Sequence, residues 1–319
     1  MRNAHLRRGL VTTMTLFVLI SIPLGVFFAQ LPAAFDGFIA ELMARSYQHG
    51  SDRPPLPLAA LQQQVARARQ RRLADYLGKV GRDCSLFSVR RGPMEMRAML
   101  RSETDALRPL LDDPDRYIDQ GDILKAGGSS TVARVRLNER SLVVKRYNIK
   151  GFGHWLRRFW RPSRAWHSWR EGHRLRFLGV TTPQPLAMLE RRRCWLRRSS
   201  YLVTEYLEGE NILARLAPYV QSSLPRDELA ALDNLFTTLD RERISHGDLK
   251  GTNLIWHNGH WALIDLDAMH QHRLRRSYLR AQARDRARFL RNWPVDSVLY
   301  TLFDGLVSEA AEISVGGAD

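Results

Sequence analysis

The stretch Ser245-His246-Gly247-Asp248-Leu249-Lys250-Gly251-Thr252-Asn253 decides how the rest of the chain is interpreted, and the apolar run after it ends at Asp265. An aspartate such as Asp248 can accept the proton of an attacking hydroxyl, and a lysine such as Lys250 can offset the charge of a transferred phosphoryl group. Asn253 and Asp265 supply oxygen ligands suited to Mg²⁺ bound to nucleotide phosphates. These residue types in this order predict a phosphotransferase site rather than a turn before a buried hairpin.

The pattern H-x-D-L-K-x-x-N, followed by a strand that ends in aspartate, is similar to the signature of the protein-kinase-like fold. That fold carries a small-residue loop and a lysine upstream, and both have candidates here. Gly127, Gly128 and Ser129 precede a predicted strand over residues 132–137, and a second predicted strand ends at Lys145. In kinase-like folds such a loop covers the phosphates and such a lysine contacts the α- and β-phosphates.

A kinase-like lysine requires a carboxylate partner from the helix that follows it. The spacing of apolar residues predicts a helix over residues 168–178, and Glu171 lies on it. Glu171 is also the only acidic residue between Lys145 and Glu190. We therefore expect Glu171 to pair with Lys145, with Glu190 as the second choice.

A buried strand that begins at Tyr201 is expected to open into a linker. In kinase-like folds the backbone of this linker, the hinge, forms hydrogen bonds with adenine. The corresponding residues here are Glu205 to Leu207, and a helix is predicted downstream over residues 227–240. We expect Glu205 and Leu207 to contact the nucleotide base.

Composition narrows the choice of partners. The 319 residues suffice for one large domain with a smaller appendage, and 44% of them are hydrophobic, which excludes disorder throughout. The net charge of +16 favours anionic partners: phosphates, nucleic acid or an anionic membrane surface. Cys84 and Cys194 lack metal-ligand spacing and suggest no disulfide framework, as is typical of the reducing cytosol.

The N-terminal segment is apolar. No charged residue occurs from Gly9 to Phe35, and arginines precede this run. The length is sufficient to span a bilayer. A spanning helix, a cleaved signal peptide and an interfacial or re-entrant segment all remain open, as do a later start and a buried helix. The topology of residues 9–35 is not decided by the sequence.

Three segments follow from these patterns. Residues 1–42 form the apolar, candidate membrane-associated helical segment. Residues 43–116 form a linker and a basic helical region, with helices predicted over residues 58–78 and 97–111, to which no chemistry is assigned. Residues 117–319 form the kinase-like domain, whose small lobe covers about 117–206 and whose large lobe covers about 207–319.

The motifs above, with Val143–Asn148 and Gly179–Pro183, resemble the lipopolysaccharide kinase family. Its members are bacterial kinase-like enzymes that phosphorylate heptose or Kdo sugars of the lipopolysaccharide inner core. The resemblance covers residues 117–293. It implies an α+β, two-lobed protein-kinase-like fold with a reduced C-terminal lobe, use of ATP and Mg²⁺, and work at the cytoplasmic face of the inner membrane. The implied partners are the core glycolipid as acceptor and an anionic membrane surface; nucleic acid is not expected, and no oligomeric state is predicted.

Two observations favour a sugar acceptor over a protein acceptor. The tail after Asp265 is short and contains no A-P-E sequence, and Gly247 replaces the arginine of H-R-D. An arginine-rich helix over residues 273–291 could hold an anionic glycolipid or be a solvated face. The alternatives are a Ser/Thr/Tyr protein kinase of the envelope and a catalytically silent pseudokinase scaffold. The intact Lys145, Asp248 and their metal-ligand candidates argue against the second.

Overall fold

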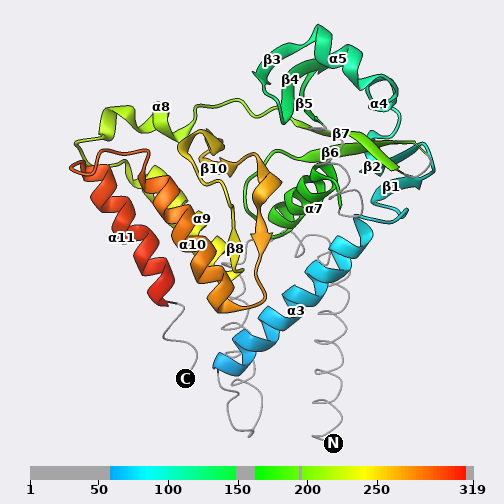
Figure 1. Cartoon of the computed structure of the whole chain (residues 1–319). Helices are drawn as coiled ribbons and strands as arrows, with labels where there is room; N and C mark the ends of the chain where they lie inside the picture. The colour runs from blue at the N-terminus through cyan, green and yellow to red at the C-terminus, as the bar shows by residue number, and fades with distance from the viewer. Residues whose placement is uncertain (1–57, 149–161, 194–195, 314–319) are drawn as a thin grey trace, which may run out of the picture. The chain divides into compact units, whose positions relative to one another are not determined.

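A computed structural model describes residues 58–148, 162–193 and 196–313 of the chain. These residues form a mixture of helices and antiparallel sheet, as predicted (Figure 1). Of the described residues, 58–74 and 177–179 belong to one compact unit, and 75–148, 162–176, 180–193 and 196–313 belong to the other. The apolar segment predicted over residues 9–35 lies outside the described residues. None of the described helices is long and apolar enough to cross a bilayer.

The first unit is described mainly through helix α3 (Leu58–Lys79). Its bounds confirm the basic helix predicted over residues 58–78. Most of the exposed positions of its described part are polar or charged, and its first turn contains no acidic residue.

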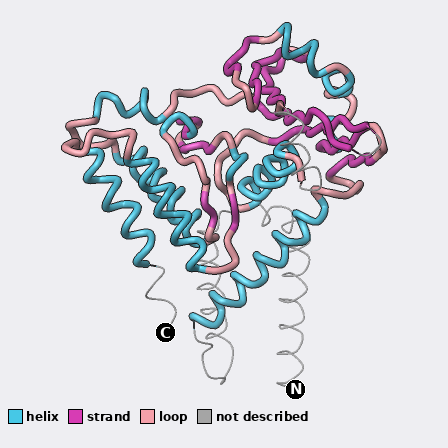
Figure 2. Tube along the Cα trace, viewed as in Figure 1, coloured by secondary structure: helices cyan, strands magenta, loops and turns pink. Residues whose placement is uncertain are grey.

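The second unit contains a seven-stranded antiparallel sheet (Figure 2). In spatial order the strands are β1 (Phe87–Arg91), β2 (Glu95–Leu100), β6 (Pro185–Arg193), β7 (Leu196–Glu205), β5 (Arg140–Tyr147), β4 (Ser130–Leu137) and β3 (Asp122–Ala126). The two strands predicted around residues 132–145 are therefore confirmed. They are joined by a tight turn in which Asn138 and Glu139 both have positive φ, as two-residue hairpins require.

The helix predicted over residues 97–111 was wrong. Residues 95–100 form β2, which is followed by the single turn η1 (Arg101–Glu103) and the short helix α4 (Arg108–Asp112). Met96 and Ala98 are buried at a spacing of two, the period of a strand, and β2 pairs with both β1 and β6. Pairing on both edges and burial outweigh the local preference for helix.

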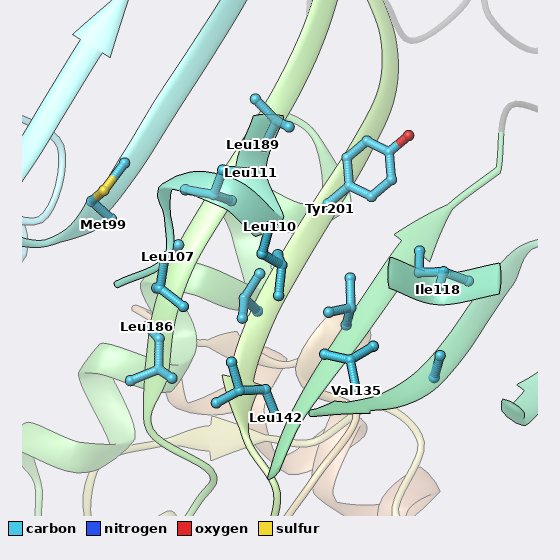
Figure 3. Packing of buried hydrophobic residues seen from close by; sticks show 14 residues of the cluster. Met99, Leu107, Leu110, Leu111, Ile118, Val135, Leu142, Leu186, Leu189 and Tyr201 are labelled. Atoms are coloured by element: carbon cyan, nitrogen blue, oxygen red, sulfur yellow. The ribbon is translucent and has the colours of Figure 1, made fainter. Parts of the chain in front are cut away.

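One face of the sheet is covered by α4 and α5 (Pro114–Gln120). Leu110, Leu111 and Ile118 from these helices pack on sheet residues such as Leu142 and Tyr201 (Figure 3). Successive side chains of a strand point to opposite faces. The burial of Leu142 and Val144 in this core therefore directs Val143 and Lys145 of the same strand to the opposite face, where the cavity described below lies.

The helix predicted over residues 168–178 is α7 (Arg164–Phe177). Its Trp169 and His173 form a buried aromatic cluster with Phe87 and Tyr76, with ring centroids 4.2 Å apart for Trp169–His173 and 5.0 Å apart for Phe87–His173. The Tyr76 hydroxyl lies 3.2 Å from Nδ1 of His173. These rings serve packing and fix α7 within the unit.

The buried His173 makes stability sensitive to acid. Burial, reinforced by the charge of Arg176, lowers the pKa of His173 from 6.5 to about 3. Since the unfolded chain binds a proton near pH 6.5 and the folded chain does not, stability is full above pH 6.5 and falls as the pH drops towards 3, by up to about 1.4 kcal/mol per pH unit. Urea unfolding between pH 7.5 and pH 4.5 should show this loss, and His173→Phe should flatten it. An unchanged slope in the variant would contradict this assignment.

The remainder of the second unit is mainly helical, and the helix predicted over residues 227–240 is confirmed as α9. The elements are α8 (Ile212–Leu216), η2 (Ala217–Tyr219), α9 (Arg226–Arg241), α10 (Arg275–Leu290) and α11 (Val298–Ile313), with the single turns η3 (Gly251–Asn253) and η4 (Leu266–Ala268). Two antiparallel strand pairs complete it, β9 (Leu254–His257) with β10 (His260–Leu263) and β8 (Ile244–Ser245) with β11 (His270–Gln271). Phe236, Phe289 and Phe303 join α9, α10 and α11 through ring contacts.

Candidate active site

A cavity of about 490 Å³ lies between the sheet and the loops that follow β8 and β10. Its lining includes these predicted site residues: Lys145, Glu205, Leu207, Lys250, Asn253 and Asp265. Among the described residues, the lining does not include the other predicted ones: Gly127, Gly128, Ser129, Glu171 and Asp248. The fold therefore gathers residues more than a hundred positions apart in the sequence around one space.

Lys145 lies at the centre of the charged wall of this cavity. Its Nζ is 2.6 Å from Oδ1 of Asp265 and 2.8 Å from Oδ2 of Asp267, and its side chain is 12% exposed. Asp265 follows β10 with left-handed backbone angles, φ 60° and ψ 58°. This conformation is uncommon for a residue other than glycine and marks a constrained position.

The predicted ion pair between Lys145 and Glu171 was wrong. The Glu171 carboxylate is buried and accepts a hydrogen bond from Nε of Arg174 at 2.8 Å. Arg174 lies three residues further along α7, a spacing that brings two helical side chains together. Glu171 thus pairs within α7, and the carboxylates that contact Lys145 come from the segment after β10.

Asp267 is a site residue that was not predicted from the sequence. Its carboxylate, 9% exposed, accepts hydrogen bonds from the side chains of Lys145 (2.8 Å), Tyr147 (2.7 Å), Arg164 (2.5 Å) and Ser168 (2.7 Å). Burial raises the pKa of Asp267, but the charge and hydrogen bond of Lys145 outweigh it and lower the pKa to about 2. The second aspartate of Asp265-Leu266-Asp267 was the available signal, because it follows the same strand.

Asp285 of α10 fixes the loop that carries Asp248 through hydrogen bonds to the loop backbone. Oδ2 of the buried Asp285 accepts the backbone N–H groups of His246 at 2.7 Å and Gly247 at 3.0 Å. Nε2 of His246 donates to the carbonyl of Ile264 at 3.0 Å, and burial lowers the pKa of this histidine, which favours the neutral ring. The loop is therefore tied both to α10 and to the segment that leads into Asp265.

Asp248 itself lies at the edge of the site and is 29% exposed. Its Oδ2 is 3.5 Å from Nζ of Lys250, and its Oδ1 contacts the guanidinium of Arg288 on α10. Partial burial raises the pKa of Asp248, but the Arg288 hydrogen bond and the Lys250 charge outweigh it, so the pKa is lowered. The carboxylate is thus ionised. Nδ2 of Asn253 donates to the Asp248 backbone carbonyl at 2.9 Å, which joins the candidate base to a metal-ligand candidate.

The loop over residues 127–129 is held by hydrogen bonds to Ser130 and Asn148. The N–H of Gly127 donates to the carbonyl of Ser130 at 3.1 Å, and Asn148 bonds to the carbonyls of both Gly127 and Ser129. A Cβ on Gly128 would meet no atom within 4 Å. The residues on either side, Lys125 and Val132, line the cavity.

The predicted hinge is anchored at its start. The Glu205 N–H donates to the carbonyl of Gln184 at 3.1 Å, and the Tyr206 N–H donates to the carbonyl of Ser141 at 3.3 Å. The hydroxyl of Thr204 donates to the Glu205 carbonyl at 3.0 Å. Leu207, the next residue after this anchored pair, lines the cavity.

Gly247 is required by the backbone of the loop that carries Asp248. Its φ is +76°, and a Cβ at this position would lie 2.5 Å from the carbonyl oxygen of Ala268. We expect Gly247→Ala to lower the free energy of unfolding by about 2 kcal/mol and to lower kcat at least tenfold, because the loop must move away from η4. Chemical denaturation and steady-state kinetics measure both quantities.

Gly305→Ala is the matched control for Gly247→Ala. Gly305 lies in α11, and a Cβ there would meet no atom within 4 Å. Alanine should leave stability unchanged or raise it by about 0.5–1 kcal/mol, as in exposed helices. Equal effects of the two substitutions would contradict a special role for Gly247.

Comparison with known proteins supports one family. Residues 116–297 match the family model described as "Lipopolysaccharide kinase (Kdo/WaaP) family". A solved structure described as "WaaP in complex with acyl carrier protein" is similar at 18% identity and a TM-score of 0.43, covering 67% of this chain and 97% of that chain. No curated protein matches the sequence.

Proposed function

This chain belongs to the lipopolysaccharide kinase (Kdo/WaaP) family and is a phosphotransferase, and from this premise we propose that it phosphorylates a heptose or Kdo hydroxyl of the lipopolysaccharide inner core. The observation that carries the proposal is the convergence of Lys145, Lys250, Asn253 and Asp265 on one cavity. A volume of about 490 Å³ is within the range of small-molecule sites. Membership of a kinase family implies that ATP is the donor.

We further propose a two-lobed kinase-like arrangement of the second unit. The kinase-like domain would comprise residues 117–319, with the small lobe over about 117–206 and the large lobe over about 207–319. In support, the sheet supplies Lys145 and the helical part supplies Asp248 and Asn253. Strands β1 and β2 precede residue 117 yet pair into the same sheet, so the small lobe would gain two strands.

The cavity provides groups for each part of a nucleotide. Leu207 and the carbonyl of Glu205 would bind the adenine, in line with the anchored strand end just before them. Lys145 would bind the α- and β-phosphates, and Asp267 would orient it through their 2.8 Å ion pair. Gly127, Gly128 and Ser129 would cover the phosphates with backbone N–H groups.

Asn253 and Asp265 fit a magnesium site. Both line the cavity, and carboxylate and amide oxygens are ligands that Mg²⁺ prefers. Nδ2 of Asn253 donates to the Asp248 carbonyl, so the amide oxygen Oδ1 is the atom left to ligate. A bound Mg²⁺ would neutralise charge on the nucleotide phosphates. Asp265 would share its carboxylate between the cation and Lys145.

Asp248 would accept the proton of the acceptor hydroxyl. At the same time the hydroxyl oxygen would form a bond to the γ-phosphorus of ATP, and the bond between that phosphorus and ADP would break. Lys250, 3.5 Å from Asp248, would stabilise charge on the transferred group. The ionised state of Asp248, favoured by its basic neighbours, suits this role. An excess of basic residues, +16 overall, supports work on an anionic glycolipid at the cytoplasmic face of the inner membrane.

The acceptor class is tested by competition. The purified full chain would be incubated with Mg²⁺ and ATP labelled at the γ-phosphate, with core glycolipid lacking inner-core phosphate and a generic protein substrate present together. We expect label on the glycolipid and none on the protein. Label on the protein alone would overturn the proposed acceptor and favour a protein kinase.

A further inference from the structure

Arg288 contacts the carboxylate of Asp248, the proposed base. It lies on α10, and its guanidinium contacts Oδ1 of Asp248, while Lys250 is near Oδ2. A base must come within about 2.6–3.2 Å of the hydroxyl whose proton it accepts. Release of Arg288 would open Oδ1 of Asp248 to the hydroxyl of a bound acceptor. Arg288 is 45% exposed and is not tied to a second acidic side chain among the described residues, so it is free to turn outwards.

Arg288 belongs to a row of exposed arginines. Arg280, Arg284, Arg288 and Arg291 follow one another at spacings of four, four and three residues, which places them on one face of the helix (orange in Figure 1). The one acidic residue of α10 is Asp285, which is buried and bonded to the backbone of the Asp248 loop. The exposed face thus carries positive charge without a counter-charge on its own helix, and its third arginine, Arg288, contacts Asp248.

We propose that Arg288 recognises an anionic group of the acceptor, a sugar carboxylate or a phosphate, beside the hydroxyl that Asp248 deprotonates. This inference rests on the proposed function. Guanidinium groups match carboxylates and phosphates through paired N–H donors, so the acceptor anion replaces Asp248 as the partner of Arg288. Asp248 then becomes available as base only when an acceptor that carries the anion is in place. Acceptor recognition and activation of the base are in this way coupled through one side chain.

The first test separates binding of the acceptor from chemistry. For Arg288→Ala, KM for core glycolipid should rise about tenfold to a hundredfold, the loss expected for a charge-assisted hydrogen bond. The kcat at saturating glycolipid and KM for ATP should stay within about threefold of wild type, since binding energy alone is removed. Arg226→Ala is the control, because Arg226 is an exposed arginine on a different helix, α9. It should change none of these constants.

The second test identifies the anion. Wild type and Arg288→Ala would be compared on core glycolipid with its carboxylates reduced and on core glycolipid with its phosphates removed. The alteration that removes the partner of Arg288 should raise KM for wild type and cause no further rise for the variant. If Arg288→Ala raised KM on both altered acceptors by the same factor as on the unaltered glycolipid, the inference would be overturned.

Other outcomes are equally decisive. A fall in kcat with unchanged KM for glycolipid would assign Arg288 to the transferred phosphoryl group instead and overturn acceptor recognition. Unchanged constants would overturn it as well. Absence of transfer by the wild-type enzyme would overturn the proposed function, an outcome distinct from normal transfer with an indifferent Arg288. Thermal unfolding of each variant shows that a change in KM does not arise from loss of the fold.

Discussion

Asp248→Asn is expected to lower kcat for phosphoryl transfer by about a hundredfold to ten-thousandfold, the range for loss of a general base. The substitution preserves the shape of the side chain and removes its ability to accept a proton. Asp248 does not line the nucleotide cavity among the described residues, and the Asn253 bond is made to its backbone carbonyl. Nucleotide binding should therefore survive. Single-turnover transfer and calorimetric titration with ATP measure the two effects separately.

Lys250→Met is the companion to Asp248→Asn. It removes a charge 3.5 Å from Asp248 and leaves the base in place. We expect a smaller fall in kcat than for Asp248→Asn. If Asp248→Asn retained kcat within tenfold of wild type, the assignment of Asp248 as base would not stand.

Asp267→Asn is expected to impair nucleotide binding and stability together. The asparagine would leave Lys145 and Arg164 without the carboxylate that both contact. Removal of one partner from a fully buried pair costs about 3–5 kcal/mol; because Lys145 retains Asp265, we expect about 2–3 kcal/mol here. The Lys145 side chain should also lose its orientation, and KM for ATP should rise about tenfold.

The pH dependence provides a check on Asp267. The pKa of Asp267 is lowered from 3.8 to about 2, so its stabilisation is full above pH 3.8 and is lost as the pH falls through 2. The difference in unfolding free energy between wild type and Asp267→Asn should therefore be constant between pH 5 and pH 8. A difference that grew or shrank across this range would contradict an ionised Asp267.

Glu171→Gln discriminates between the predicted and the observed partner of the lysine. Glu171 bonds to Arg174 and lies outside the cavity lining among the described residues. Its replacement should leave KM for ATP unchanged, whereas Asp267→Asn raises it. The reverse ranking, measured by titration with ATP, would restore Glu171 as the lysine partner.

The proposed catalytic loop could be located from the sequence because its motif is local. Asp248, Lys250 and Asn253 lie within six residues, and the apolar strand before Asp265 fixes the direction of the second acid. The alternation of β5 likewise decides that Lys145 and Leu142 lie on opposite faces of the sheet. Such features depend on residue type and spacing alone.

The partners of these residues could not be predicted because they depend on packing between distant segments. Glu171 and Asp267 are both acidic, and the residue type alone does not decide which of them pairs with Lys145. The position of η4 places the Asp267 carboxylate 2.8 Å from the lysine. The contact of Arg288 with Asp248 joins residues forty positions apart through the docking of α10. Strand β2 was mistaken for a helix because its identity comes from pairing with β1 and β6.

The most direct test of the proposed function is the mass of the acceptor after reaction. Core lipopolysaccharide lacking inner-core phosphate would be incubated with ATP, Mg²⁺ and either the wild-type chain or Asp248→Asn, and the glycolipid would then be weighed by mass spectrometry. We expect the glycolipid to gain one phosphate with the wild-type chain and none with Asp248→Asn. An unchanged glycolipid with a wild-type chain that binds ATP would contradict the proposed function.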